Sequence, residues 1–164
     1  MKRSTYEIII AVILTVAYIV TFAVGFLGSA FVAGPVAPNI VHQYLGGSWK
    51  ILTSTSGRSI SVIAPGLLQV KSETLEDSYG DLLIVNIYTF NSQQAASQFF
   101  NSFSPIPATL QEGNLRLAVE NAGLTYTIYA INGNTVIYLS YVNGGVTSTA
   151  PAVTQLIGLI SQIS

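Results

Sequence analysis

Cysteine is absent from this chain of 164 residues. Its absence excludes disulfides, thiolate zinc sites, iron–sulfur clusters and cysteine nucleophiles, because each of these needs the thiol. The only histidine is His42, so two histidines cannot meet at a metal ion, and an ordinary Ser-His-Asp triad has little basis. The chain also lacks a Gly-x-Ser-x-Gly elbow and a phosphate-binding Gly-rich loop. We therefore expect neither an enzyme nor a bound cofactor.

Charge is also scarce. Charged residues make up 8% of the chain, against about a quarter of a typical soluble protein. The 6 Lys and Arg are outnumbered by 7 Asp and Glu, which excludes a basic groove for nucleic acid. A polar surface built mainly from Ser, Thr, Asn, Gln and Tyr suits an exterior at low pH, where carboxylates are protonated. The composition therefore predicts an acidic exterior, such as that of an acidophile.

A long apolar run lies near the amino terminus. Residues 8–49 contain no Asp, Glu, Lys or Arg, and residues 8–32 are almost wholly apolar. At about 1.5 Å per helical residue these reach roughly 37 Å, enough to cross a hydrocarbon core of about 30 Å. We therefore predict one transmembrane helix over residues 8–33, in contact with the lipid bilayer. The run is too long for the core of a cleaved signal peptide, but Gly28-Ser29-Ala30 leaves cleavage open as the alternative.

The flanking charges predict the orientation of this span. Lys2 and Arg3 precede it, and the next cation, Lys50, lies well beyond its end. By the positive-inside rule, residues 1–7 stay in the cytoplasm and the rest of the chain faces outward. The chain is thus expected in the cell membrane, as a signal-anchored protein with an extracytoplasmic domain.

Small side chains recur every fourth residue within the predicted span, and so share one face of a helix. Such a stripe lets a second helix approach closely, which is what favours helix pairing in lipid. The stripe predicts a helix–helix interface with another membrane or cell-envelope protein, although small residues are also common in spans that pair with nothing. Its members are Thr21, Gly25, Ser29 and Ala33.

The remaining chain has the length and pattern of one domain. Residues 34–47 begin with Gly-Pro-Val-Ala-Pro, which predicts a short Gly/Pro tether. Residues 48–164 carry alternating apolar runs of strand length and two amphipathic segments, which predict an α+β fold of mostly antiparallel strands with two helices packed on one face. Strands are expected near residues 49–51, 60–63, 68–73, 82–90, 115–120, 124–131 and 136–142, and helices at residues 93–103 and from about 150 to the end.

The last predicted hairpin combines a clear turn with a set of tyrosines. Asn132-Gly133 between two β-branched runs predicts a type I′ turn, because both residues tolerate a positive φ. Four of the 9 tyrosines lie on these two strands, and alternation places them in two pairs on opposite faces. With one face exposed, Tyr129 and Tyr141 are candidates for a partner-binding surface. Ordinary cross-strand packing is the alternative.

Four carboxylates lie close together in sequence. Oxygen-rich clusters hold Ca²⁺, but this spacing fits no calcium-loop signature, and Asp77-Ser78-Tyr79-Gly80-Asp81 is typical of a connection before a strand. We therefore predict a solvated loop and keep a metal site as the weaker reading. The residues are Glu73, Glu76, Asp77 and Asp81.

These features predict a single-pass membrane protein whose extracytoplasmic domain binds or scaffolds, as a non-catalytic accessory subunit of a membrane or cell-envelope complex. A pilin-like filament subunit is the first alternative. The basic start, the long apolar helix and Glu7 near its beginning resemble the pilin arrangement, whereas Ser4-Thr5 departs from the Gly or Ala that usually precedes the prepilin cleavage site. The second alternative is a metal-dependent sensor or enzyme that uses the acidic segment.

Overall fold

The computed structural model describes residues 34–57, 64–144 and 150–164. The predicted cytoplasmic terminus, the predicted span and its stripe of small residues lie outside these ranges. Within them, every helix is too short, or not apolar enough, to cross a membrane. The account below concerns the compact unit that includes Ala33–Ser164.

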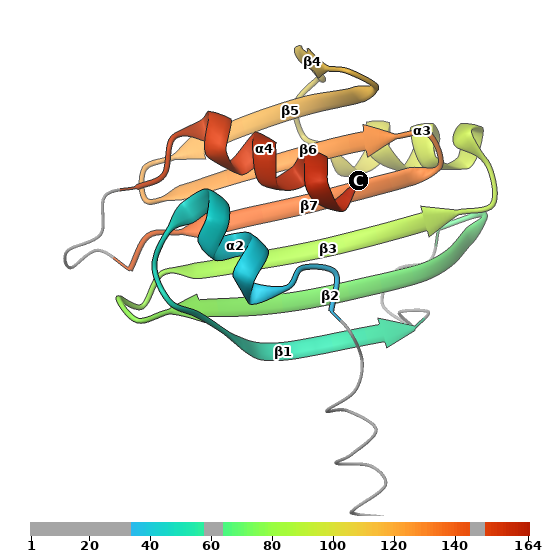
Figure 1. Cartoon of the computed structure of the whole chain (residues 1–164). Helices are drawn as coiled ribbons and strands as arrows, with labels where there is room; N and C mark the ends of the chain where they lie inside the picture. Colours follow the sequence, from blue (N-terminus) through green and yellow to red (C-terminus); the bar gives the residue numbers. More distant parts are fainter. Residues whose placement is uncertain (1–33, 58–63, 145–149) are drawn as a thin grey trace, which may run out of the picture. The chain divides into compact units, whose positions relative to one another are not determined.

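The described residues form an α+β fold with one antiparallel sheet of seven strands, in the order β1-β2-β3-β7-β6-β5-β4 (Figure 1). The central pair is β3 and β7, which come from the two halves of the chain and pair along their whole length. The elements are α2 (Pro38–Leu45), β1 (Trp49–Gly57), β2 (Leu67–Asp77), β3 (Leu82–Phe90), α3 (Gln93–Phe103), β4 (Leu110–Glu112), β5 (Leu115–Ala122), β6 (Thr125–Asn132), β7 (Thr135–Val142) and α4 (Val153–Ile163).

Helices cover both faces of the sheet. In Figure 1, α2 and α4 lie in front of the strands and α3 lies behind them. The buried residues accordingly form two clusters, one beneath α2 and α4 and one beneath α3. The prediction of two helices on one face is therefore wrong. The physical reason is that β3, β6 and β7 carry apolar residues at successive positions, so each of these strands has two faces to bury.

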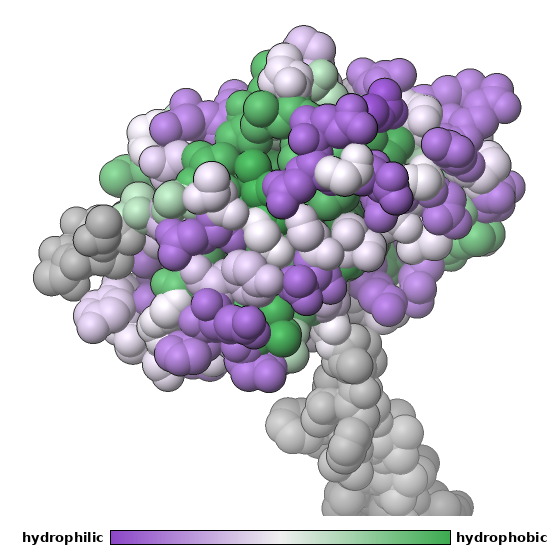
Figure 2. All heavy atoms as spheres, turned by 45° about the horizontal axis from the view of Figure 1, so that its top comes forward, coloured by the Kyte–Doolittle hydropathy of each residue, from purple (hydrophilic) through white to green (hydrophobic). Residues whose placement is uncertain are grey.

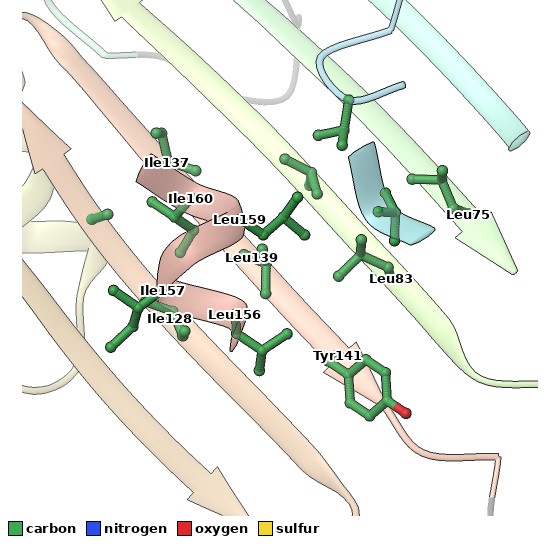
Figure 3. Packing of buried hydrophobic residues seen from close by; sticks show 14 of the residues in the cluster. Leu75, Leu83, Ile128, Ile137, Leu139, Tyr141, Leu156, Ile157, Leu159 and Ile160 are labelled. Atoms are coloured by element: carbon green, nitrogen blue, oxygen red, sulfur yellow. The ribbon is translucent and has the colours of Figure 1, made fainter. Parts of the chain in front are cut away.

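The front cluster joins α4 to the middle of the sheet. Leu156, Leu159 and Ile160 of α4 are fully buried, and Figure 3 shows the helix lying against β7, the strand that carries Ile137 and Leu139. Burying a side chain of this size contributes about 1.5–3 kcal/mol. Docking against the sheet, and not intrinsic propensity, is therefore what stabilises this short helix.

The back cluster is aromatic. Phe99 and Phe103 of α3 stack with ring centroids 5.0 Å apart, and Phe103 also contacts Tyr129 edge-on at 5.6 Å. Tyr88 of β3 lies 5.0 Å from Phe99. The helix begins as its sequence predicts, because the Ser92 hydroxyl accepts a hydrogen bond from the Ala95 amide. The apolar face of α3 is thus a packing surface on the sheet.

Gly-X turns connect the last four strands. Gly113, Gly123 and Gly133 each have a positive φ and each stands first in a two-residue turn. At the final hairpin the turn residues are Gly133-Asn134, one position later than predicted, and only Gly133 has a positive φ. The type I′ prediction is therefore wrong, because type I′ needs a positive φ at both central residues. Asn134 instead donates its side-chain amide to the Phe90 carbonyl at 3.0 Å.

The predicted tether contains a helix. Within residues 34–47, α2 runs from Pro38 to Leu45. Proline fits the first position of a helix because the N–H that it lacks has no partner there. Gly46, with φ 70°, caps the carboxyl end. Val36 and Val41 are buried in the front cluster, which explains why this Pro-rich segment docks instead of extending away. The folded unit thus starts well before the predicted boundary at residue 48.

Two strands near the edge are longer than predicted. β1 continues through the Thr53–Gly57 segment, which lies between the strands predicted at residues 49–51 and 60–63, and β2 reaches Asp77. The predicted strand at residues 60–63 lies outside the described residues.

The surface mixes apolar and hydrophilic residues. In the view of Figure 2, apolar residues gather in the upper part and hydrophilic residues cover much of the rest. Scattered single apolar residues are ordinary on a protein surface. The large exposed apolar residues are Ile51, Leu52, Leu68, Tyr79, Leu110 and Leu124.

Candidate functional site

The acidic segment is largely strand, and most of it is buried. Glu73, Asp77 and Asp81 are 1%, 7% and 2% exposed, so the predicted solvated loop is wrong for three of its four carboxylates. Glu76 is the exception: it is partly exposed and pairs with Lys50 of β1 at 2.9 Å. The alternation of β2 turns Glu73 and Asp77 to the side of buried Leu75, away from Glu76.

Two of the buried carboxylates organise the turn between β2 and β3. One Asp77 carboxylate oxygen accepts hydrogen bonds from the amides of Tyr79 (2.7 Å) and Asp81 (3.0 Å). Asp81 accepts from the Tyr141 hydroxyl at 2.5 Å and from the Gly144 amide at 2.7 Å. These groups hold strand ends together, which is a structural role.

The four carboxylates do not converge on a common point. In the part of the chain that the structure describes, no group of three or more His, Asp or Glu side chains could hold a metal ion. Asp77 and Asp81 direct their oxygens to backbone amides and a hydroxyl, while Glu76 directs its own to a lysine. The acidic segment therefore lacks the ligand set that a calcium site requires.

Glu73 differs from the other three. One of its oxygens, Oε2, accepts the Val36 amide at 2.9 Å, and the other, Oε1, is buried without a hydrogen-bond partner. The register partner of Glu73 on β1 is Ser54, whose hydroxyl is likewise buried and unpartnered. Burial raises the pKa of the Glu73 carboxyl, and the Val36 amide offsets part of this rise.

The tyrosine surface is absent. Tyr129 is 9% exposed and Tyr141 is 2% exposed, and the two belong to different clusters on opposite faces of the sheet. The predicted partner-binding surface at these two residues is therefore wrong. The four tyrosines do form cross-strand pairs, with Tyr126 opposite Tyr141 and Tyr129 opposite Tyr138. They pack the core because helices cover both faces.

His42 lies on α2 and is exposed, as expected for a surface residue. Its Nδ1 lies 2.5 Å from the Gly47 carbonyl oxygen, so this nitrogen carries the proton and donates it. The contact closes the carboxyl end of α2.

One open hollow of about 380 Å³ lies beside the carboxyl end of α3. Phe100, Ser104 and Arg116 are among its lining residues, and the Arg116 guanidinium lies 5.9 Å from the centroid of the Phe100 ring. The single ion pair of the described residues joins Lys50 to Glu76, so no described carboxylate pairs with Arg116.

β1 forms one edge of the described sheet, and the short strand β4 forms the other. β1 is nine residues long and pairs only with β2 among the described strands. Ile51 and Leu52 are 45% and 47% exposed on it, and a bulge lies between Ile51 and Thr53. Unpaired edge backbone is a template for pairing with an extended segment of another chain.

Sequence reasoning named Glu73 but did not predict its burial, and it missed the β1 edge. For Glu73 a signal was available, because Glu73, Leu75 and Asp77 alternate with residues that face the other side of one strand. For β1 the polar run Thr53-Ser54-Thr55-Ser56-Gly57 predicts a turn between two strands, and no residue in it marks a sheet edge.

No protein-family model matches the chain, and no curated protein matches it in sequence. In structure the chain is similar to the extracellular domain of PknH from Mycobacterium tuberculosis. The TM-score is 0.47 and the identity 9%, over 78% of this chain and 89% of that one. None of the three comparisons assigns a ligand or partner to this chain.

Proposed function

We propose that this chain is a membrane-anchored, non-catalytic binding subunit. Residues 8–33 would hold it in the bilayer with residues 1–7 in the cytoplasm. The α+β domain would lie outside the cell and bind an extended segment of another membrane or cell-envelope protein along β1.

The β1 edge is the observation that carries the binding role. β1 offers a row of backbone groups along nine residues, and from Thr53 to Gly57 it carries no charge or proline of the kind that commonly blocks edge pairing. The buried carboxylates of Asp77 and Asp81 accept hydrogen bonds from the Asp81 amide and the Tyr141 hydroxyl, respectively, which supports a structural role for both. Added strands bind through main-chain hydrogen bonds and gain specificity from alternate side chains.

The test replaces one exposed leucine on β1. Full-length protein would be purified from its native membranes in mild detergent, and the copurifying proteins of the wild type and the Leu52→Lys variant compared. A charge at the edge opposes strand addition, so Leu52→Lys should lose a partner that the wild type retains.

The matched control is Leu124→Lys. Leu124 is 61% exposed, in the turn between β5 and β6, four strands away in the sheet order. This variant should keep the partner. The binding role fails if Leu52→Lys keeps every partner, or if both variants lose the same ones.

The anchor is tested separately. An epitope tag would be placed at each end of the full chain, and intact cells would be digested with protease. The amino-terminal tag should stay protected, and the carboxyl-terminal tag should be removed. Recovery of the intact chain in the soluble fraction would overturn the anchor. Replacing Gly25 and Ser29 with Leu should weaken any association made through the small-residue stripe, because the larger side chains keep a second helix away.

A further inference from the structure

We propose that Glu73 is a proton-operated clamp, which holds the segment Gly34–Val36 against the sheet when the carboxyl is protonated and loosens it when the carboxyl is ionised. The clamp depends on the described domain alone. It stands whether or not residues 8–33 lie in a membrane and whether or not β1 binds a partner, so its test is independent of both.

The geometry joins the first described residues to the middle of β2. The Glu73 Oε2 atom accepts the Val36 amide at 2.9 Å, across 37 positions of the chain. Gly34 lies so close that a Cβ atom there would overlap the Glu73 carboxyl group. Val36 itself is 2% exposed, so its side chain and its amide are both docked. The segment Gly34–Val36 therefore packs directly against the Glu73 carboxyl group.

The hydrogen-bond inventory favours the protonated acid. Glu73 Oε1 and Ser54 Oγ are both buried without partners, and the two residues face each other across β1 and β2. An ionised carboxylate can only accept hydrogen bonds, whereas the neutral acid also carries a donor. An ionised and unpaired carboxylate at 1% exposure is far more costly than the neutral acid.

Among the residues that the structure describes, no charged group near Glu73 provides a counter-ion. On β2, Lys71 and Asp77 share its face, yet Lys50–Glu76 is the only ion pair among the described residues. The facing residue of β1 is Ser54 and that of β3 is Val85, neither of which titrates.

The surrounding segments are equally poor in charge. Residues 34–37 and α4 contain no ionisable side chain. On α2 the ionisable side chains are His42, which bonds the Gly47 carbonyl, and Tyr44.

The sign of the pH dependence follows from burial. Burial raises the pKa of Glu73 above its ordinary value of 4.5, so the folded form holds its proton at a pH where the unfolded chain has lost it. Between those two pKa values, stability and clamping therefore fall as pH rises. Within that window the opening equilibrium changes by about tenfold per pH unit. Above the pKa of Glu73 in the folded state, stability no longer changes with pH through this group. Below its pKa in the unfolded state, the protonated carboxyl makes its full contribution to stability.

The experiment uses the full-length protein in detergent micelles and hydrogen–deuterium exchange read by mass spectrometry. Peptides that cover residues 34–41 report the clamp, and peptides from β3 report the core. Exchange is measured across the acidic to neutral range and corrected at each pH for the intrinsic exchange rate. Wild-type protection of residues 34–37 should fall with rising pH, by up to about tenfold per pH unit, while β3 stays protected.

Two variants separate the clamp from general pH effects. Glu73→Gln keeps the shape of the side chain but cannot ionise, so its protection of residues 34–37 should not depend on pH. Glu76→Gln, on the opposite face of the same strand, should behave as the wild type does. The proposal is overturned if Glu73→Gln and the wild type show the same pH trend. It is also overturned, without any variant, if wild-type protection of residues 34–37 does not change with pH.

Discussion

The Tyr141 hydroxyl donates a 2.5 Å hydrogen bond to Oδ2 of Asp81, and so links the carboxyl end of β7 to the residue that precedes β3. The other Asp81 oxygen accepts the Gly144 amide at 2.7 Å. Asp81 is 2% exposed although the turn before it carries the exposed Tyr79. A buried carboxylate is tolerable here because donors from a distant strand satisfy it.

Removing this hydroxyl should destabilise the fold. For Tyr141→Phe we expect the free energy of unfolding to fall by about 1–3 kcal/mol, since the change leaves a buried charged acceptor short of a donor. Chemical denaturation of the full-length protein in detergent measures it. Tyr79→Phe is the matched control, because Tyr79 is 57% exposed and its loss should change stability by less than about 0.5 kcal/mol. Equal effects of the two variants would contradict the structural role of Asp81 and Tyr141.

The turn between β2 and β3 should depend on the Asp77 side chain. Asp77→Ala removes the acceptor of the Tyr79 and Asp81 amides, so the free energy of unfolding should fall by about 1–3 kcal/mol, at about 0.5–1.5 kcal/mol per hydrogen bond. Asp77→Asn retains an acceptor oxygen and should cost less. The same denaturation experiment compares the two variants. An equal loss for Asn and for Ala would show that the charge, and not an acceptor oxygen in the turn, is what the fold needs.

Metal addition should not stabilise the domain. None of the described residues form a group that could hold a metal ion, so millimolar Ca²⁺ and EDTA should give the same melting temperature within error. Thermal melting of the full-length protein measures this. A Ca²⁺-dependent rise that Asp77→Asn and Asp81→Asn abolish would restore the metal-dependent alternative.

Close packing between α2 and α4 should depend on Gly158. A Cβ atom at this position would lie 2.8 Å from the Tyr44 ring, so Gly158→Leu should push the two helices apart and cost about 1–3 kcal/mol. Gln162→Leu places the same side chain on an exposed position of the same helix, and it should be nearly neutral. Denaturation together with proteolysis near α2 would measure both effects. If both variants are neutral, the Gly158 contact does not hold α2.

Some elements could be predicted because their signals are local. β3 and α3 occupy the predicted ranges, since an apolar run, a serine cap and a helical spacing of phenylalanines all lie within 22 residues (82–103). The α+β class is also confirmed. The hairpins of β5, β6 and β7 follow from alternation and from glycine between the strands. Each of these signals depends only on neighbouring residues.

The wrong predictions concern properties that depend on residues distant in sequence. Tyr129 and Tyr141 were expected on a surface because one face of the sheet was taken as open, whereas α3 covers one and α4 the other. Asp81 was expected in water because its partners, Tyr141 and Gly144, are 60 and 63 positions away. The segment before residue 48 was expected to be a tether because the core that receives Val36 and Val41 is built by later strands.

By itself the sequence determined which chemical groups the protein has, with no thiol and little charge. It also determined the type of most helices and strands, because their hydrophobic periodicity depends on neighbouring side chains. Only the tertiary structure decided which faces are buried and which acids are satisfied. The physical reason is that burial and hydrogen bonding are set by distant partners, as Glu73 shows with Val36 and Ser54.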